Sequence, residues 1–249
     1  MQFNVASYTN IGGREVNEDS ILCRQEEGFV IAAVADGLGG HGGGKIASTR
    51  AIQSLEEQES LLKTQDEQTL REVCAQVNRA VLNEQTTQVR MKTTLALAVI
   101  GEGRIAFMHV GDSRAYLVRA GRISYQSQDH SVSQLAVLTG AIKPEQIRFH
   151  EDRNKVLRSL GNEAGAVPDI LLVDEPLREG DAVLLCTDGF WEYVTEREML
   201  RALRHAKNAG DWIARMTRLI KRRAGKKNDN NSAVAVLCPV AARPSRWRK

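Results

Sequence analysis

The chain contains 249 residues, of which 42% are hydrophobic and 26% are charged, and its net charge is only +3. This length and composition allow a sizeable hydrophobic core in one large domain or two small ones. The N-terminus lacks a positively charged segment followed by an apolar stretch, and no apolar run approaches the ~20 residues of a membrane helix. We therefore expect a soluble, cytoplasmic protein with no membrane segment.

Short β-type runs dominate the chain, and tight turn signals join several of them. GEG (101–103) and AG (120–121) are typical of hairpins, which favours antiparallel sheets over repeated βαβ units. The runs are FNVASYT (3–9), FVIAAVA (29–35), TLALAVI (94–100), RIAFMHV (104–110), AYLVRA (115–120), DILLV (169–173), AVLLC (182–186) and SAVAVLC (232–238).

Amphipathic helices are predicted in separate blocks, at 66–89, 196–206 and 210–223. The first has apolar residues at helical spacing, and Thr64 and Glu67 form a capping-box pattern before it. Helical blocks beside hairpin strands predict an α+β layered fold with sheets in the middle and helices outside. Because the sequence shows no repeat or linker, we expect a single domain over residues 1–240 and a flexible basic tail over 241–249.

The cysteines lie far apart without a C-x-x-C pair, so neither a zinc knuckle nor a disulfide framework is indicated, and reduced, mostly buried thiols are expected. They are Cys23, Cys74, Cys186 and Cys238. Basic residues are concentrated in KRRAGKK (221–227) and RPSRWRK (243–249). Aromatic residues that could stack on bases are scarce there, so a solvated helix end and tail are favoured over a nucleic-acid site.

The glycine-rich segment VADGLGGHGGGKIAS (34–48) matches two phosphate-binding patterns by spacing alone. Residues 39–45 fit a P-loop, but Ile46 stands where a Ser or Thr must hold magnesium. Gly37, Gly39 and Gly42 spell the dinucleotide fingerprint, which belongs in a βαβ unit that the hairpin signals disfavour. Both patterns are weak. His41, inside the segment, is expected to have a structural role at a helix start.

Acidic residues stand at the ends of several predicted strands. Asp36, Asp112 and Asp188 each follow an apolar run, while the pair Glu18–Asp19 and Asp229 each precede one. Each acid alone is typical of a turn. If the strand ends meet at one rim, however, the carboxylates need protons or cations to offset their repulsion. Ligand sets made only of oxygen select Mg²⁺ or Mn²⁺.

A centre with two such ions is suited to in-line displacement at phosphorus. Gly37 has no Cβ, so its backbone could approach an ion. Glu18 and Asp19 are adjacent in an extended segment and point to opposite faces, so one would bind directly and the other through water or a neighbouring bond. Arg14 would supply the positive fork that fits phosphate oxygens.

Eight motifs, taken in order over about residues 5–238, resemble those of the protein phosphatase 2C family in its compact bacterial form. They are GREVNEDS, VADGLGGHGGG, MKTTLALAVI, HVGDSRAYLVRAG, QDHSV, RNKVLRSLG, LLCTDGFWEYV and DNNSAVAV. The resemblance implies a four-layer α-β-β-α sandwich, two antiparallel β-sheets flanked by helix pairs. It also implies a metal-dependent protein serine/threonine phosphatase, which hydrolyses phosphoserine and phosphothreonine by direct attack of a metal-bridging hydroxide.

The resemblance also implies the main ligands of two Mn²⁺ or Mg²⁺ ions. Asp36 is similar to the carboxylate that bridges both ions and is the central catalytic residue. The Gly37 carbonyl would bind one ion. Asp188 and Asp229 resemble ligands of the other.

The remaining implied roles lie around this centre. Glu18 and Asp19 resemble the pair that holds metal mainly through water, and Asp112 resembles the acid that supports a third, weaker metal site together with Asp188. Arg14 corresponds to the catalytic residue that binds the substrate phosphate. Residues 131–157 occupy the place of the mobile flap.

Several residues depart from the family pattern or need a role of their own. Leu38 stands where animal members carry a His proposed as general acid, so that role is open. Lys45 and Lys92 are interpreted as surface changes without consequence for catalysis. His109 is expected in the core, and His130 is expected to contact backbone near the flap.

Three rival functions fit the sequence less well. A cysteine-nucleophile phosphatase needs an Arg six residues after its Cys, and none of the four cysteines has one. A non-catalytic phosphoprotein-binding regulator of the same fold is disfavoured because no metal acid is missing, and no base-recognition feature supports a nucleotide substrate. The expected partners are phosphorylated proteins and a cognate bacterial Ser/Thr kinase, with no nucleic acid or membrane, and the protein is expected to be a monomer.

Overall fold

Two antiparallel five-stranded sheets form the centre of the computed structural model, which describes residues 3–39 and 42–238. The first sheet has the order β1 (Asn4–Asn10), β12 (Asn231–Leu237), β11 (Ala182–Cys186), β8 (Arg114–Arg119), β9 (Arg122–Gln126). The second has the order β10 (Asp169–Val173), β7 (Ile105–Val110), β6 (Leu95–Ile100), β3 (Phe29–Ala35), β2 (Ser20–Glu26). A short pair, β4 (Gly37–Leu38) and β5 (Lys92–Thr93), stands beside them.

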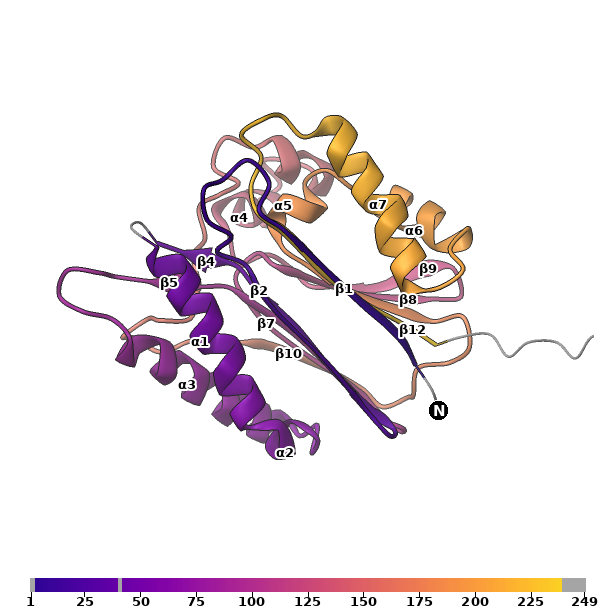
Figure 1. Ribbon diagram of the computed structural model, residues 1–249, viewed down its shortest axis with the longest axis horizontal. Helices are drawn as coiled ribbons and strands as arrows, with labels where there is room; N and C mark the ends of the chain where they lie inside the picture. The colour runs from indigo at the N-terminus through magenta and orange to yellow at the C-terminus, as the bar shows by residue number, and fades with distance from the viewer. Residues whose placement is uncertain (1–2, 40–41, 239–249) are drawn as a thin grey trace, which may run out of the picture.

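Helices cover the outer face of each sheet (Figure 1). α1 (Gly43–Glu57), α2 (Glu59–Leu62) and α3 (Glu67–Asn83) lie over the second sheet, and α6 (Glu196–Arg204) and α7 (Ala209–Arg223) lie over the first. The short helix α5 (Asp188–Trp191) follows β11, while α4 (Val132–Leu138) and the 3₁₀ helix η1 (Pro144–Phe149) belong to the segment between β9 and β10. The predicted α-β-β-α sandwich is confirmed.

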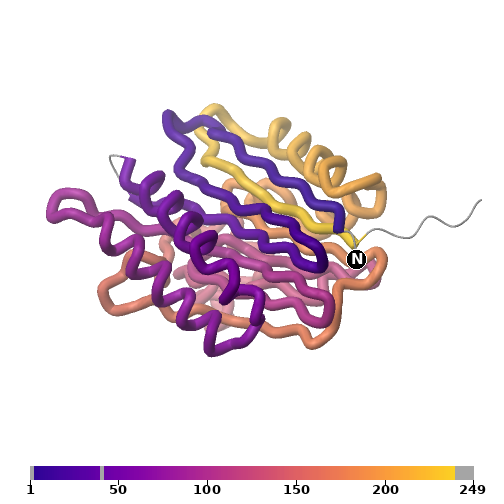
Figure 2. Tube along the Cα trace, turned by 60° about the horizontal axis from the view of Figure 1, so that its bottom comes forward, coloured from indigo at the N-terminus to yellow at the C-terminus, as the bar shows by residue number. Residues whose placement is uncertain are grey.

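Three hydrophobic cores hold the four layers together. The strand β3 contributes to two of these cores, because successive side chains point to opposite faces of a strand. Ile31 and Ala33 pack against the helices α1 and α3, whereas Val30 and Val34 pack between the sheets. The third core lies between the first sheet and α5, α6 and α7. The tube trace in Figure 2 shows the same stacking from another side.

The eight strands named from the sequence all form, within one residue at each end. Both hairpin predictions are confirmed: β6 pairs with β7 around residues 101–104, and β8 pairs with β9. Ala120 and Gly121 make the second turn with φ values of 51° and 73°. Because a glycine adopts positive φ without strain, the AG pair was a usable turn signal.

The first predicted helix was too long, and its predicted cap was wrong. α3 ends at Asn83 rather than residue 89. Gln85 donates hydrogen bonds to the carbonyls of Met91 and Gly161, which draws the following chain into a loop. At the other end Asp66, not Thr64, caps the helix by accepting from the Thr69 N–H at 2.9 Å. The Thr64 hydroxyl instead closes the preceding turn on the Leu61 carbonyl.

Other elements were missed, chiefly α1, β2 and β9. α1 begins within the glycine-rich segment, which propensity alone disfavours as a helix. The structural role predicted for His41 and the basic tail predicted for 241–249 lie outside the described residues. Within the described ranges, no helix combines the length and the apolar character needed to cross a membrane.

Candidate active site

A cleft of about 600 Å³ opens where strands of both sheets end. Seven of the eight predicted site residues line it, and the eighth, Asp19, is buried outside its lining. The seven are Arg14, Glu18, Asp36, Gly37, Asp112, Asp188 and Asp229. The cleft is therefore formed by residues far apart in sequence that the sandwich brings to one rim.

Two threonines fix the turn that presents Asp36 after β3. The Asp36 N–H donates to the Thr94 hydroxyl at 3.0 Å, and the Asp36 carbonyl accepts from the Thr94 N–H and the Thr93 hydroxyl at 2.9 Å each. The Thr94 hydroxyl also shares a hydrogen bond of 2.7 Å with that of Ser113, next to Asp112. The MKTT and GDS motifs thus hold two acidic turns together.

Two glycines explain how the chain segments approach so closely at the cleft. A Cβ on Gly37 would lie 2.1 Å from the Gly44 carbonyl oxygen at the start of α1. A Cβ on Gly189 would lie 2.0 Å from the Asn230 carbonyl oxygen. The glycine-rich segment therefore packs a helix start against the Asp36 turn and serves neither glycine pattern considered from the sequence.

Asp188 begins α5, and a buried tryptophan anchors that helix. The Trp191 indole donates to the Asp112 carbonyl at 2.9 Å, which joins the Asp188 helix to the Asp112 turn. The Arg114 guanidinium lies 3.5 Å from the centre of the Trp191 ring and forms two hydrogen bonds to Asp129. This cation–π contact and ion pair hold α5 in place.

Glu18 and Asp19 face different ways, as expected for neighbours in an extended segment. Glu18 lines the cleft, and its N–H donates to the Asn230 side chain at 2.8 Å. Asp19 is 2% exposed. The Thr187 hydroxyl donates to its Oδ2 at 3.0 Å, whereas its Oδ1 is buried with no hydrogen-bond partner. A buried carboxylate oxygen without a donor is suited to a cation.

The interpretation of Lys45 as a plain surface residue was wrong. Its amino group donates to the Asp19 carbonyl at 2.9 Å and to the Ser20 hydroxyl at 3.1 Å, and the side chain is half-buried. The lysine therefore supports the backbone of a predicted metal-binding residue. Lys92 is exposed, as predicted.

The carboxylates of the cleft raise one another's pKa values. Burial raises the pKa of Asp36 well above its usual range, and the charge of Asp188 adds to the effect. The pKa of Asp112 shifts in the same direction for the same two reasons. Burial raises the pKa of Asp19 to about 7, and it raises that of Asp188 to about 6 with a further contribution from Asp229. Because these acids destabilise one another when ionised, the oxygen-only set fits divalent cations.

Arg14 lines the cleft, and its guanidinium forms an ion pair with Asp229. Its Nε and Nη2 donate to the two oxygens of Asp229 at 2.9 and 2.6 Å. The side chains are 55% and 35% exposed, so solvent and ligands can reach the pair. Asp229 therefore occupies the guanidinium donors of Arg14 that were predicted to bind the substrate phosphate.

Two asparagines at the rim of the cleft were not predicted as site residues. Asn230 donates to the carbonyls of Ile11 and Val16 and so fixes the loop that presents Arg14. Asn154, from the predicted flap, lines the cleft. The DNN and RNK motifs contained both asparagines, but neither has an ionisable side chain that would mark it.

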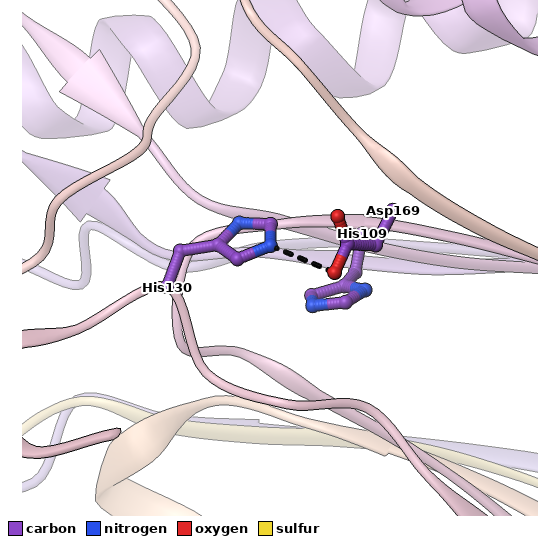
Figure 3. A group of neighbouring side chains, drawn as sticks. All are labelled: His109, His130 and Asp169. Carbon is purple, nitrogen blue, oxygen red and sulfur yellow. Dashed lines mark ion pairs between the residues drawn. The ribbon is translucent and has the colours of Figure 1, made fainter. Parts of the chain in front are cut away.

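A second group of ionisable residues lies outside the cleft (Figure 3). The ligand atoms of His109, His130 and Asp169 all lie within 4.8 Å of one another, and the two imidazoles stack with centroids 4.6 Å apart. His130 Nδ1 accepts the Gly111 N–H, and its Nε2 lies 3.2 Å from Asp169 Oδ2 and 3.4 Å from Arg158 Nη1. Both ring nitrogens of His130 therefore already have partners within the protein. The burial of His109 and the backbone contact of His130 agree with the core and backbone roles predicted for the histidines.

Comparison with known proteins agrees with the geometry. The protein phosphatase 2C family model matches residues 8–230. The serine/threonine phosphatase stp of Listeria monocytogenes is 32% identical over 200 residues, which are 77% of this chain and 79% of that protein. The crystal structure of the Mycobacterium tuberculosis phosphatase PstP/Ppp superposes with a TM-score of 0.81 at 29% identity, covering 96% of this chain and 99% of that one.

A further structure bears on the cleft. The catalytic domain of the serine/threonine phosphatase PstP, solved in complex with two manganese ions, has a TM-score of 0.74 at 28% identity and covers 95% of this chain and 99% of that one. The present chain belongs to the protein phosphatase 2C family and is a serine/threonine phosphatase.

Proposed function

We propose that this phosphatase removes phosphate from phosphoserine and phosphothreonine side chains of proteins with the help of two Mn²⁺ or Mg²⁺ ions. The observation that supports this most strongly is the convergence of Asp36, Asp188 and Asp229 on one cleft with raised pKa values at the first two. When bound, such ions polarise phosphoryl oxygens and lower the pKa of water. Asp36 would hold both ions.

Other residues around the cleft would complete the metal site. The Gly37 carbonyl and Asp188 and Asp229 would complete the coordination, with Glu18 contributing from the cleft wall. Asp19 would support the site from below, where its Oδ1 has no other partner. We propose Asp112, with Asp188, for a third and weaker ion.

Arg14 would orient the substrate phosphate. Its guanidinium is exposed enough to exchange Asp229 for a phosphate group, which the planar fork also fits. Asn154, in the predicted flap, also lines the cleft and could donate to a phosphoryl oxygen. Leu38 lines the cleft without a proton to give, so the proton for the leaving group would come from another source, such as water or the surroundings of the substrate.

The experiment is turnover of a phosphothreonine peptide in EDTA and after addition of Mn²⁺ or Mg²⁺. Activity should vanish in chelator and return with metal. Asp36→Asn should lower kcat by more than the ~10–100-fold typical of changes beyond the direct ligands. Asp174→Asn, at an exposed position outside the cleft, is the matched control and should leave kcat unchanged. Full turnover in EDTA would refute the two-metal proposal.

We propose further that a Ser/Thr kinase supplies the phosphoproteins and that the enzyme acts as a monomer in the cytoplasm. The relatives are serine/threonine phosphatases, which supports a Ser/Thr kinase as the source of the phosphoproteins. Thiols that are buried, as at Cys74, Cys186 and Cys238, suit a reducing compartment. Light scattering after size-exclusion chromatography tests the monomer, and phosphoproteomics of a deletion strain tests the substrates.

A further inference from the structure

Residues of α6 and α7 line a groove of about 610 Å³. These two helices lie over the outer face of the first sheet (Figure 1). The helices bury their apolar faces, including Met199 and Trp212, against that sheet. Ala202 and Leu219 form the apolar part of the groove. Basic side chains stand around it, namely Arg201, Arg215, Arg218, Lys221 and Arg222.

The charge of this groove is not balanced within the protein. Arg215 pairs with Asp211, and Arg223 pairs with Glu198. Glu196 pairs with Arg148 on η1, so all three acids of this region have partners. Among the described residues, the remaining groove cations form no ion pair; they are Arg201, Arg218, Lys221 and Arg222.

The imbalance is local. Residues 196–227 contain eleven lysines and arginines against three acids, although the whole chain has a net charge of only +3. Cations in the last turn of a helix interact favourably with its dipole, which accounts for Arg201 on α6 and for Lys221 and Arg222 on α7. The dipole does not account for Arg218, nor for a concave surface between the helices.

We propose that this groove binds an acidic segment of the phosphoprotein substrate; the proposal rests on the proposed function of the cleft. A segment that pairs carboxylates with the basic rim and an aliphatic side chain with Leu219 would complement both features of the groove. Among the described residues that line it, His205 supplies the only aromatic ring, so it offers little of the stacking surface on which nucleic-acid sites depend.

One wall of the groove, α7, leads into the segment that lines the cleft. The chain passes from the end of α7 to Asp229 in the cleft within six residues, and Arg223 donates to the Tyr193 carbonyl just beyond α5. The cations proposed for the cleft would be used by its own carboxylates and by the phosphate, so an acidic segment beside the phosphosite needs a positive surface elsewhere. A basic groove nearby would supply that surface and raise the rate of encounter, with a strong dependence on salt.

The test compares two phosphothreonine peptides that share one phosphosite. One continues through a flexible linker into a segment of Glu, Asp and Leu, and the other has Gln in place of the acids. In Mn²⁺ at low salt, the acidic peptide should have a kcat/KM on the order of tenfold higher, and the advantage should shrink as salt is added. Arg218→Glu/Arg222→Glu should abolish the advantage.

The matched control is Arg79→Glu/Arg122→Glu, which changes net charge equally at exposed positions on other elements, α3 and β9. It should keep the preference. All variants should hydrolyse p-nitrophenyl phosphate like the wild type, and loss of that activity in the wild type would indicate failure of the proposed function instead. No preference in the wild type, or equal loss in the control, would overturn the groove proposal. So would binding of duplex DNA but not of the unphosphorylated acidic peptide in fluorescence anisotropy.

Discussion

Arg14 donates hydrogen bonds to both carboxylate oxygens of Asp229, from Nε at 2.9 Å and from Nη2 at 2.6 Å. The two residues are 215 positions apart in sequence, and both line the cleft. A cation that binds Asp229 must compete with this guanidinium for the same oxygens. Arg14 and the metal are therefore linked, and releasing Asp229 to a cation frees the arginine for phosphate.

Arg14→Ala should raise KM for phosphopeptides about 10- to 100-fold while changing kcat less. A charge-assisted hydrogen bond contributes ~1.5–3 kcal/mol, and an arginine that holds phosphate in both ground and transition states contributes uniform binding. Steady-state kinetics at saturating Mn²⁺ measures both parameters. An unchanged KM with a collapse of kcat would instead assign Arg14 to transition-state stabilisation.

The same variant should not weaken metal binding. Removal of the guanidinium takes away a competitor for Asp229, so Mn²⁺ should bind to Arg14→Ala at least as tightly as to the wild type in calorimetry. Asp229→Asn should bind less Mn²⁺, because an amide is a poorer ligand than a carboxylate. Weaker binding to Arg14→Ala would show that the arginine helps to build the site.

Lys45→Met should lower the free energy of unfolding of the metal-free protein by about 1–2 kcal/mol, since the half-buried amino group donates to the Asp19 carbonyl and to Ser20. Lys92→Met is the natural control, because this exposed lysine also departs from the family pattern. Its effect should stay within about 0.5 kcal/mol. Urea denaturation measures the unfolding free energy of both variants. Equal losses in the two would show that Lys45 has no special stabilising role.

The strands and the acids at their ends could be predicted because both leave local signals. Short, nearly continuous apolar runs marked the strands, and Asp36, Asp112 and Asp188 stand within two residues after such runs. The contact of Lys45 with Asp19 had no such signal, because it joins a helix to a separate segment 26 residues earlier. The Arg14–Asp229 pair likewise depends on sheet topology. Beyond a helix start at His41, the helix α1 was not predicted, because its glycines serve close packing against Gly37, which propensity does not register.

Alkylation of the native enzyme with iodoacetamide should leave its activity intact. Burial raises the pKa of Cys74 to about 12 and that of Cys186 further, so neither thiol supplies a thiolate near neutral pH. Cys23, the most accessible thiol, lies outside the cleft and should react first. Mass spectrometry would follow labelling alongside turnover, and activity lost in step with labelling would point to a thiol in the mechanism.

Metal should stabilise the protein increasingly as pH rises. Burial raises the pKa of Asp188 to about 6 and that of Asp19 to about 7, against roughly 3.9 in an unfolded chain. Between the unfolded and folded pKa values, the metal-free native state binds more protons than the unfolded state. The metal-free protein therefore loses stability as the pH rises from roughly 4 to about 7. The buried pair His109 and His130 acts in the opposite sense, because burial lowers both of their pKa values.

The difference in unfolding free energy between Mn²⁺ and EDTA isolates the carboxylates, because the histidine pair contributes equally to both measurements. From pH 5 to pH 7.5 this difference should grow by at least about 2 kcal/mol, since one unit of pKa shift corresponds to ~1.4 kcal/mol and a bound cation holds the acids ionised. Urea denaturation at each pH would measure it. In Asp36→Asn most of the growth should disappear. A difference that stays flat with pH in the wild type would mean that the clustered acids of the cleft are not the groups that bind the metal.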